Sequence, residues 1–319
     1  MNRNYLTIFF LFFILFVTAQ TKMQPGFELL EKGQFAEAET FFKTYLETDP
    51  TNKTAQLCYG RAVGLSGEPE KATGLFQTLL KEYPGDFEIE INYNESYLWA
   101  KDYATAEPLY AKLVKDYPDK FGALLGYANT LSNLKKYNKA LEWVEKALIL
   151  DPNNESAKVS RKYMRLGYAN AYVNDQDYAN GRKLLEAIFI DFPEDTDALQ
   201  NLANLYLITK EVEKAKDIYG RYAVAAKDSI TALNGIALAE HIAENDKTAL
   251  EVSTEAKLKV ARIENTELTE KTYDRYIQAL IWNQKFVKAR KLTDSLENHY
   301  PNRNWILALK ATLGLYTGS

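Results

Sequence analysis

Apolar residues recur at helical spacing along most of the chain, in pairs of short segments. Between residues 121 and 152 the first segment carries Leu124, Tyr127, Ala128, Leu131 and Leu134 on one face, and the second carries Ala140, Leu141, Val144, Ala147 and Leu148. The residues from 133 to 137 form the turn between them, and Pro152 ends the pair because proline cannot continue a helix. Neither helix can bury its apolar face alone. The pattern therefore predicts helix pairs that stack on neighbouring copies of themselves.

This pattern repeats along the chain. A small residue occupies the Ala140 position eight times, at Ala38, Ala72, Ala106, Ala140, Gly181, Ala215, Ala249 and Ala289. A second small column marks the first helices, at Gly26, Gly60, Ala128, Ala169, Ala203, Ala237 and Ala311, and is interrupted by Asn94 and Ile277. A closing proline recurs at Pro50, Pro84, Pro118, Pro152, Pro193 and Pro301. Small side chains allow two helices to approach closely, so both columns are predicted to be buried helix contacts.

Most intervals in the Ala140 column are 34 residues, and two are longer. The interval from Ala140 to Gly181 is 41 residues, which predicts one helix over 155–173 that is about two turns longer than its counterparts. The interval from Ala249 to Ala289 is 40 residues, and we expect it to lengthen the second helix of the seventh pair before residues 264–267 turn the chain.

A 34-residue period with these small-residue and proline columns resembles the tetratricopeptide repeat. The resemblance implies an all-α fold, an α-solenoid that winds as a right-handed superhelix of about eight helix-turn-helix repeats and a terminal helix. The expected solenoid covers 20–319, with repeats at approximately 20–52, 53–86, 87–120, 121–154, 155–195, 196–229, 230–269, 270–303 and a partial ninth at 304–319. Because the ninth copy lacks a second helix and is apolar on several sides, we expect the chain to continue past Ser319, the alternative being a natural end that docks on something.

Residues 1–19 do not fit the repeat and are typical of a secretory signal peptide. Arg3 supplies a positive start, residues 6–17 are apolar apart from Thr7, and residues 17–19 are the small residues that a signal peptidase reads. The apolar core is shorter than the roughly 20 residues that span a bilayer. We therefore expect export to the periplasm or the cell surface, with an uncleaved anchor as the weaker alternative.

Charge and cysteine content restrict the partners. Without residues 1–19 the chain has 38 basic and 43 acidic residues, a net charge of −5, which argues against a nucleic-acid partner. Cys58 is the only cysteine, so the fold depends on packing and has no internal disulfide.

The two histidines, His241 and His299, belong to different repeats and have no second ligand at metal-binding spacing. No phosphate loop or nucleophile motif is present, so we predict no enzyme activity, no cofactor, no metal and no small-molecule substrate.

The resemblance implies that first helices line a concave groove that binds a peptide segment or a helix. Asparagines recur directly after the small residues of the first helices or near them. In the family, asparagine at the position after the small residue often binds a ligand's backbone; the alternative is that asparagine is simply common here. The groove candidates are Asn129, Asn170, Asn204, Asn133, Asn174, Asn201, Arg61, Trp99 and Trp282. The positions at which some members bind a carboxylate tail hold Leu57, Ile91, Leu125, Leu166 and Gln200. A chaperone-tail receptor is therefore not expected.

The sequence favours a non-catalytic scaffold of the bacterial cell envelope that binds a protein or peptide partner, with outer-membrane association as an option. Two alternatives stay open. Aromatic side chains on first helices could stack on sugars, as in exported glycan-binding proteins, although those proteins normally carry a lipobox cysteine that this chain lacks. The repeats could also be the N-terminal periplasmic module of a larger envelope or outer-membrane protein.

Overall fold

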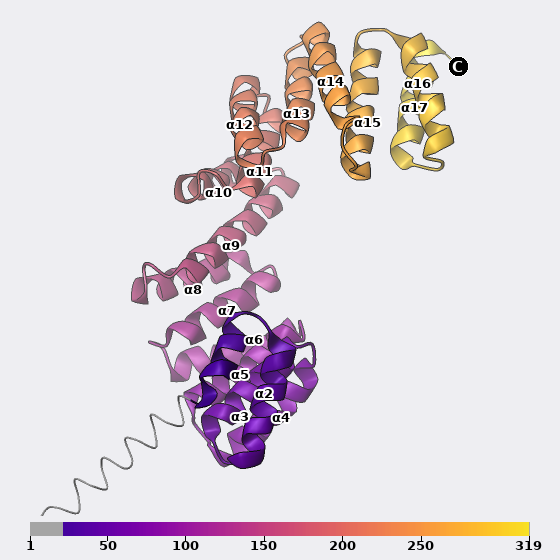
Figure 1. Ribbon diagram of the computed structural model, residues 1–319. Coiled ribbons are helices and arrows are strands. Elements are labelled where there is room, and N and C mark those ends of the chain that lie inside the picture. Colours follow the sequence, from indigo (N-terminus) through magenta and orange to yellow (C-terminus); the bar gives the residue numbers. More distant parts are fainter. Residues whose placement is uncertain (1–21, 319) are drawn as a thin grey trace, which may run out of the picture. The chain divides into compact units, whose positions relative to one another are not determined.

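The computed structural model describes residues 22–318, and within them it contains helices and turns (Figure 1). The predicted signal peptide, residues 1–19, lies outside the described residues. The described chain divides into two compact units, the first ending at Met164 and the second beginning at Arg165. The division falls inside the helix α9 (Glu155–Asn174), so each unit is considered by itself.

The first unit consists of helices joined by short turns. A helix over residues 22–31 comes first. It is followed by α2 (Phe35–Thr48), α3 (Lys53–Leu65), α4 (Pro69–Glu82), α5 (Phe87–Trp99), α6 (Tyr103–Asp116), α7 (Phe121–Asn133) and α8 (Tyr137–Leu150). Neighbouring helices along the chain pack together, and α5 also contacts α3 and α7. The first helices α3, α5 and α7 therefore stack on one another, as the repeat pattern predicts.

The second unit follows the same plan. Its helices after α9 are α10 (Tyr178–Asp191), α11 (Thr196–Ile208), α12 (Val212–Ala225), α13 (Ser229–Ile242), α14 (Asp246–Val260), α15 (Thr266–Trp282), α16 (Phe286–His299) and α17 (Asn304–Thr317). The first helices α11, α13, α15 and α17 contact one another in succession. The all-α solenoid expected from the sequence is confirmed. None of the described helices is long and apolar enough to cross a membrane.

The small columns form the tightest helix contacts. Every alanine of the Ala140 column is fully buried, from Ala38 to Ala289. In the first-helix column Ala128, Ala169, Ala203 and Ala237 are also fully buried, whereas Ala311 on α17 is exposed. The interruptions Asn94 and Ile277 are buried as well, so the position tolerates a larger side chain where the neighbouring helix gives room.

The starts of most first helices are fixed by a column of Asn and Asp residues directly before them. Side-chain oxygens of these residues accept hydrogen bonds from backbone N–H groups in the first turn of the next helix, which have no partner within the helix. The residues are Asn52, Asp86, Asn154, Asp195, Asp228 and Asn265. The column thus defines where these six first helices begin, whereas α7 and α17 follow Lys120 and Arg303, which provide no side-chain cap.

The turn inside each helix pair contains one residue in the left-handed conformation, with φ between 58° and 110°. Only glycine adopts this conformation without steric cost. The column comprises Gly33, Gly67, Lys101, Lys135, Gln176, Lys210, Glu244 and Gln284. Six of the eight positions therefore carry a side chain where glycine would be easier.

The two longer intervals have different structural origins. The helix predicted over 155–173 is confirmed, since α9 has 20 residues against 13 in α7. The expectation for the second interval is wrong, because α14 has only 15 residues. Instead α15 has 17 residues, and the added turn lies at its N-terminal end, where Asn265 caps it. The insertion therefore lengthens a first helix.

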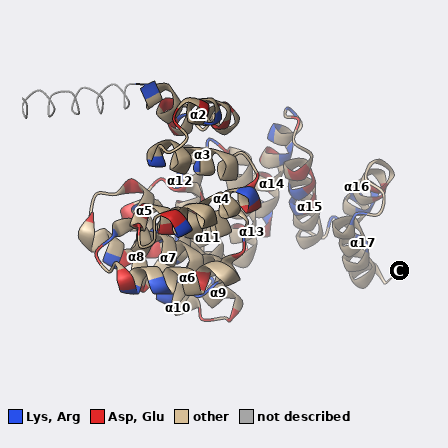
Figure 2. Ribbon diagram, turned by 90° about the horizontal axis from the view of Figure 1, so that it is seen from below, with Lys and Arg blue, Asp and Glu red and all other residues tan. Residues whose placement is uncertain are grey.

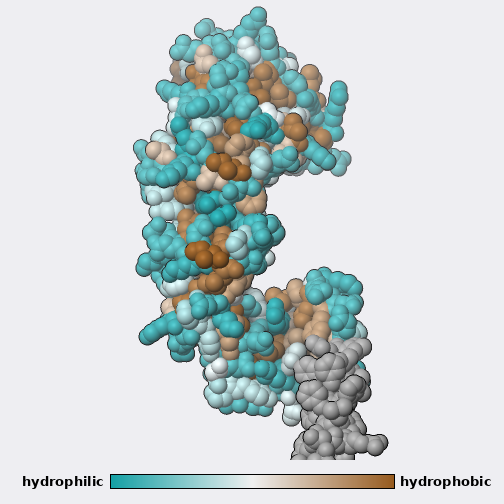
Figure 3. Space-filling model, turned by 90° about the vertical axis from the view of Figure 1, so that its left-hand side faces the viewer, coloured by the Kyte–Doolittle hydropathy of each residue, from teal (hydrophilic) through white to brown (hydrophobic). Residues whose placement is uncertain are grey.

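The surface is polar overall. Lys and Arg are interspersed with Asp and Glu over the helices (Figure 2). Large apolar side chains are exposed singly or in small groups, for example Ile190, Val287 and Leu315. On the face shown in Figure 3 the apolar patches are separated by hydrophilic residues.

Candidate binding recess

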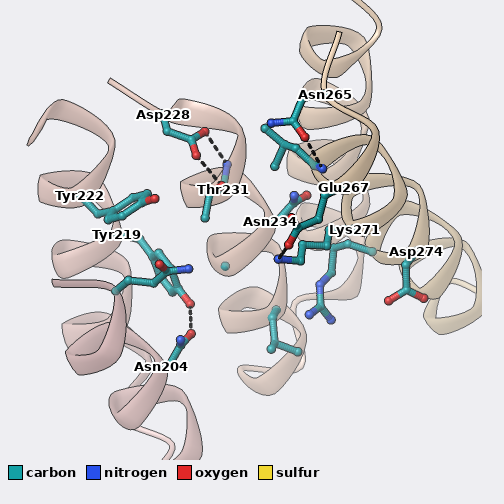
Figure 4. Close-up of a pocket in the computed structure, with 15 residues that line it drawn as sticks. Asn204, Tyr219, Tyr222, Asp228, Thr231, Asn234, Asn265, Glu267, Lys271 and Asp274 are labelled. Atoms are coloured by element: carbon teal, nitrogen blue, oxygen red, sulfur yellow. Dashed lines mark hydrogen bonds and ion pairs between the residues drawn. The ribbon is translucent and has the colours of Figure 1, made fainter. Parts of the chain in front are cut away.

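A recess of about 480 Å³ lies in the second unit, on the side formed by the first helices. We call it the α13 recess, because α13 lies at its centre, between Tyr219 and Tyr222 of α12 and the N-terminal half of α15 (Figure 4). Its lining residues are Gln200, Asn204, Tyr219, Tyr222, Asp228, Thr231, Asn234, Gly235, Leu238, Asn265, Glu267, Leu268, Lys271, Asp274 and Arg275. Hydrogen-bonding side chains make up most of this lining.

A glycine on α13 sets the shape of one wall. An added Cβ at Gly235 would lie 2.1 Å from Cζ of Tyr219, far inside van der Waals contact. The absence of a side chain lets the Tyr219 ring lie flat against α13. There its hydroxyl donates a hydrogen bond to Oδ1 of Asn204, at 2.6 Å. Burial raises the pKa of Tyr219 to about 12, so its hydroxyl remains a neutral donor at physiological pH.

Amide groups form the centre of the recess. Nδ2 of Asn234 donates to Oγ1 of Thr272 on α15, at 2.9 Å. Its Oδ1 is buried and has no hydrogen-bond partner among the described residues. Nε of Arg275 is also buried, and no acceptor for it lies within residues 22–318. Buried polar atoms are nearly always satisfied in folded proteins by protein groups or by water, so these two atoms can each form a hydrogen bond with a molecule that enters the recess.

Most of the carboxylates at the recess are already engaged. Oδ1 of Asp228 accepts from the backbone N–H groups of Ile230 and Thr231, and caps α13. Glu267 pairs with Lys271 at 2.7 Å. Both carboxylate oxygens of Asp274 accept from the Gln278 side chain, at 3.1 and 3.0 Å, and burial raises the pKa of Asp274.

The recess is suited to binding more than to catalysis. Within residues 22–318 no group of three or more His, Cys, Asp or Glu side chains has the geometry of a metal site. Burial raises the pKa of Cys58, in the first unit, to about 11, so its thiol stays protonated and is a poor nucleophile. The amides and tyrosines of the α13 recess can donate and accept hydrogen bonds, but they form no nucleophile–base pair.

The predicted groove residues of the second unit fall in several places. Asn204 lines the α13 recess. Asn201 lies on the same helix, but its Nδ2 donates to the backbone oxygen of Asp197. Asn170 and Asn174 are exposed on α9. The Trp282 ring stacks on His241, with centroids 3.7 Å apart, and so belongs to the packing between α13 and α15.

The predicted groove residues of the first unit lie on different helices and differ in exposure. Arg61 is exposed on α3, and Asn129 is half-buried on α7. Asn133 is exposed, and its Nδ2 donates to the backbone oxygen of Asn129 at 2.9 Å. Trp99 packs near Phe76, with ring centroids 6.3 Å apart. Binding by these residues and by those of the second unit remains a prediction.

Several residues of the recess were not predicted from the sequence. The column that holds Leu57, Ile91, Leu125, Leu166 and Gln200 continues as Asn234 and Asp274, three residues before Ala237 and Ile277. The column becomes polar at Gln200, and following it to Asn234 and Asp274 would have identified two members of the recess. Tyr219 and Arg275 lie outside this column, and the repeat pattern gives no signal for them.

Comparison with known proteins supports the repeat assignment. Tetratricopeptide repeat models match residues 29–91, 97–160 and 166–229. No curated protein matches the chain.

Solved structures include similar chains. One is a tetratricopeptide repeat protein from Parabacteroides merdae, with 15% identity and a TM-score of 0.47, over 79% of this chain and 98% of that chain. PilW, a widely conserved type IV pilus biogenesis factor, has 15% identity and a TM-score of 0.46, over 68% of this chain and 96% of that chain. MamA from Desulfovibrio magneticus has 20% identity and a TM-score of 0.42, over 54% of this chain and 93% of that chain. The repeat models match well over half of the residues, so the chain belongs to the tetratricopeptide repeat family, whose members generally act as non-catalytic scaffolds for protein interaction.

Proposed function

We propose that this chain is a non-catalytic scaffold of the bacterial cell envelope that binds a peptide segment of a partner protein along its first helices. In the second unit the contact point is the α13 recess. The observation that carries the proposal is the pair of buried polar atoms there, Oδ1 of Asn234 and Nε of Arg275, which form no hydrogen bond with any described residue.

The hydrogen-bonding capacity of the recess suits a polypeptide backbone. A peptide unit offers one N–H donor and one C=O acceptor, whatever its side chains. Oδ1 of Asn234 needs a donor and Nε of Arg275 needs an acceptor. Asn204 and Gln200 on the neighbouring α11 supply further amides. An extended segment crossing α11, α13 and α15 would therefore satisfy groups that the fold leaves open.

The binding proposal can be tested with a library of random dodecapeptides displayed to the purified protein. Selected peptides are expected to bind Asn234→Leu and Asn204→Ala at least several-fold more weakly than the wild type, because one or two hydrogen bonds are lost. Asn138→Ala is the matched control, since Asn138 is exposed on the second helix α8 and is not among the predicted groove residues. Asn129→Ala with Asn170→Ala tests the predicted asparagine column in the same assay. Unchanged binding in all of these variants would refute the peptide groove.

A soluble glycan panel tests the alternative with the same protein. Binding to a glycan that is weakened by Tyr222→Ala, with no peptide selected by the recess, would replace the peptide proposal with sugar recognition. Tyr222 is a suitable probe because its ring lines the recess, where an aromatic face could stack on a sugar.

The envelope location rests on the predicted signal peptide and has its own test. The intact mass of the native protein from an envelope fraction is expected to lack residues 1–19, which would lower it from the 36.4 kDa of the full sequence. A mass that retains these residues, or recovery only from the cytoplasm, would contradict export. A much larger mass would favour the alternative in which the repeats are one module of a longer envelope protein.

A further inference from the structure

Glu95 on α5 occupies the position in its repeat that Asn204 occupies in the α13 recess, directly after the small-column position of a first helix. Tyr110 on α6 corresponds in the same way to Tyr219, four residues after the small residue of a second helix. In the second unit the tyrosine hydroxyl donates to the asparagine at 2.6 Å. In the first unit the Tyr110 hydroxyl has no hydrogen-bond partner among the described residues, and Glu95 forms neither a hydrogen bond nor an ion pair with any of them.

The ring of Tyr110 is held against α7 at a glycine. An added Cβ at Gly126 would lie 2.3 Å from Cε1 and 2.8 Å from Oη of Tyr110, so a larger residue would displace the ring. Tyr110 is fully buried, and burial together with the charge of Glu95 raises the pKa of its hydroxyl. The hydroxyl therefore stays protonated, and the Glu95 carboxylate is near enough to act on it.

The Glu95 carboxylate is half-buried. Burial raises its pKa, and the charge of Arg61 on α3 acts in the opposite direction. Arg61 is exposed, however, and within residues 22–318 it forms no ion pair with Glu95. A carboxylate that has lost part of its hydration in this way is stabilised strongly by a cation that contacts it.

A further acceptor lies one turn away on the same helix. Asn92 precedes Glu95 by three residues, a spacing that places two side chains on the same face of a helix. Its Nδ2 donates to the backbone oxygen of Glu88 at 2.6 Å, whereas its buried Oδ1 accepts no hydrogen bond from any described residue. The groups that the fold leaves open here are thus a carboxylate, an amide oxygen and a hydroxyl, all of which can accept hydrogen bonds.

We propose that Glu95, Asn92 and Tyr110 form a site for a primary ammonium group of the bound polypeptide, which pairs with the carboxylate and donates hydrogen bonds to the amide oxygen and the hydroxyl oxygen. An ammonium has three donors and no acceptor on a compact charge, which matches acceptors that come from side chains of α5 and α6. The inference rests on the proposed peptide function and adds a contact in the first unit together with the chemical class that it recognises. The ammonium belongs to a lysine side chain or to a chain N-terminus, and the test separates these sources.

The test uses three small probes with the full-length protein at neutral pH. N-acetyl-lysine methylamide carries a side-chain ammonium, glycine methylamide carries a terminal ammonium, and N-acetyl-norleucine methylamide is an uncharged analogue of the lysine probe. The side-chain carboxyl carbon resonance of Glu95, assigned by its loss in Glu95→Gln, is followed by NMR during titration with each probe. We expect a saturable shift with at least one ammonium probe and a much weaker one with the norleucine probe. The ammonium probe that shifts the resonance identifies the source of the group.

Variants provide an independent readout, in which binding is measured from the broadening of the probe's own NMR signals. Glu95→Gln keeps the shape without the charge and is expected to weaken binding on the order of tenfold or more, since a charge-assisted hydrogen bond is lost. Tyr110→Phe removes only the hydroxyl and should weaken binding roughly threefold. Neither change should lower stability in urea titrations, because neither group has a partner among the described residues. Glu47→Gln is the matched control, because Glu47 is exposed on the second helix α2.

The outcomes distinguish this inference from the proposed function. Equal shifts with the norleucine and lysine probes, or unchanged binding in Glu95→Gln, would overturn the ammonium site, while displayed peptides that still depend on Asn204 and Asn234 would leave the peptide function standing. A lower stability of Glu95→Gln than of Glu47→Gln would also overturn the site, because Glu95 would then be paired within the fold. If the ammonium probes bind through Glu95 but no displayed peptide is selected, the ammonium site stands and the peptide function is wrong.

Discussion

The replacement of Gly235 by alanine tests how the wall of the α13 recess is built. Gly235 is buried in α13, and the added Cβ would lie 2.1, 2.4 and 2.5 Å from three carbons of the Tyr219 ring. Carbon atoms normally pack about 3.5–4.0 Å apart, so the ring would have to move by roughly 1.5 Å. Tyr219 is only 3% exposed, and its hydroxyl bonds Asn204 at 2.6 Å. The ring therefore has little room to move without breaking that bond.

The expected cost follows from these contacts. Overpacking of a well-packed core costs about 1–3 kcal/mol, and the lost Tyr219–Asn204 hydrogen bond adds about 1 kcal/mol. Alanine recovers about 0.5–1 kcal/mol, because glycine is unfavourable inside a helix. We therefore expect Gly235→Ala to lower the free energy of unfolding by about 1–3 kcal/mol. Gly220→Ala is the matched control, since its Cβ would meet nothing within 4 Å, and it should be neutral or stabilising.

The assay is urea unfolding followed by circular dichroism, together with hydrogen exchange of the α11 to α13 amides, because repeat arrays do not always unfold in one step. In a Tyr219→Leu background the ring atoms that cause the clash are absent, so Gly235→Ala should no longer destabilise. The reasoning would be refuted if Gly235→Ala and Gly220→Ala had equal stability in the wild-type background.

Three further predictions concern the first unit. Lys135→Gly should raise the free energy of unfolding by up to about 1 kcal/mol in urea titrations, because Lys135 has φ 60° and glycine avoids the cost of this conformation; Lys135→Ala should not. Ala140→Leu should lower it by about 1–3 kcal/mol in the same titrations, since Ala140 is fully buried between helices. The ammonium of Lys53, 2.7 Å away, and backbone N–H groups lower the pKa of Asp86 in the folded protein. Asp86 therefore stabilises the fold fully above about pH 4, the pKa of an aspartate in the unfolded chain, and this stabilisation is lost as the pH falls through the lower pKa of the folded state. Asp86→Asn should flatten this acid limb in thermal melts recorded between pH 3 and about pH 7.

The helical solenoid could be predicted because its determinants are local and repeated. Ala140 and its equivalents recur at a fixed interval, and all seven alanines of the column are fully buried. The left-handed turn column was harder to see. Gly33 and Gly67 indicate this turn in the first copies. Later copies have residues such as Lys135 and Gln176 at the same position, where the left-handed conformation is unfavourable and the residue type does not indicate it. The second insertion was placed in the wrong helix because Asn265, the cap of α15, was read as part of a turn.

The binding recess was predicted only in part, for a different reason. Asn204 was predicted because it follows the small column, but the same rule also selected Asn170, and Asn174 and Asn201 were predicted because they lie nearby. None of these three lines the recess. The rule gives a position on a first helix. It does not show whether a neighbouring side chain, such as Tyr219, reaches that position from the second helix. Such contacts depend on the packing between successive pairs, which a repeat pattern leaves undefined.

The column three residues before the small residue of each first helix changes from apolar to polar along the chain, and this change forms the recess. Leu57, Ile91, Leu125 and Leu166 occupy this column in the earlier copies, whereas Gln200, Asn234 and Asp274 occupy it in α11, α13 and α15. Because α11, α13 and α15 contact one another in succession, these three polar side chains fall on neighbouring helices and line one recess. These residues are half-buried, and the side chains of Asn234 and Asp274 form hydrogen bonds with Thr272 and Gln278 on α15. The fold is therefore maintained by the columns that stay small and apolar, and the recess forms where a partly buried column becomes polar.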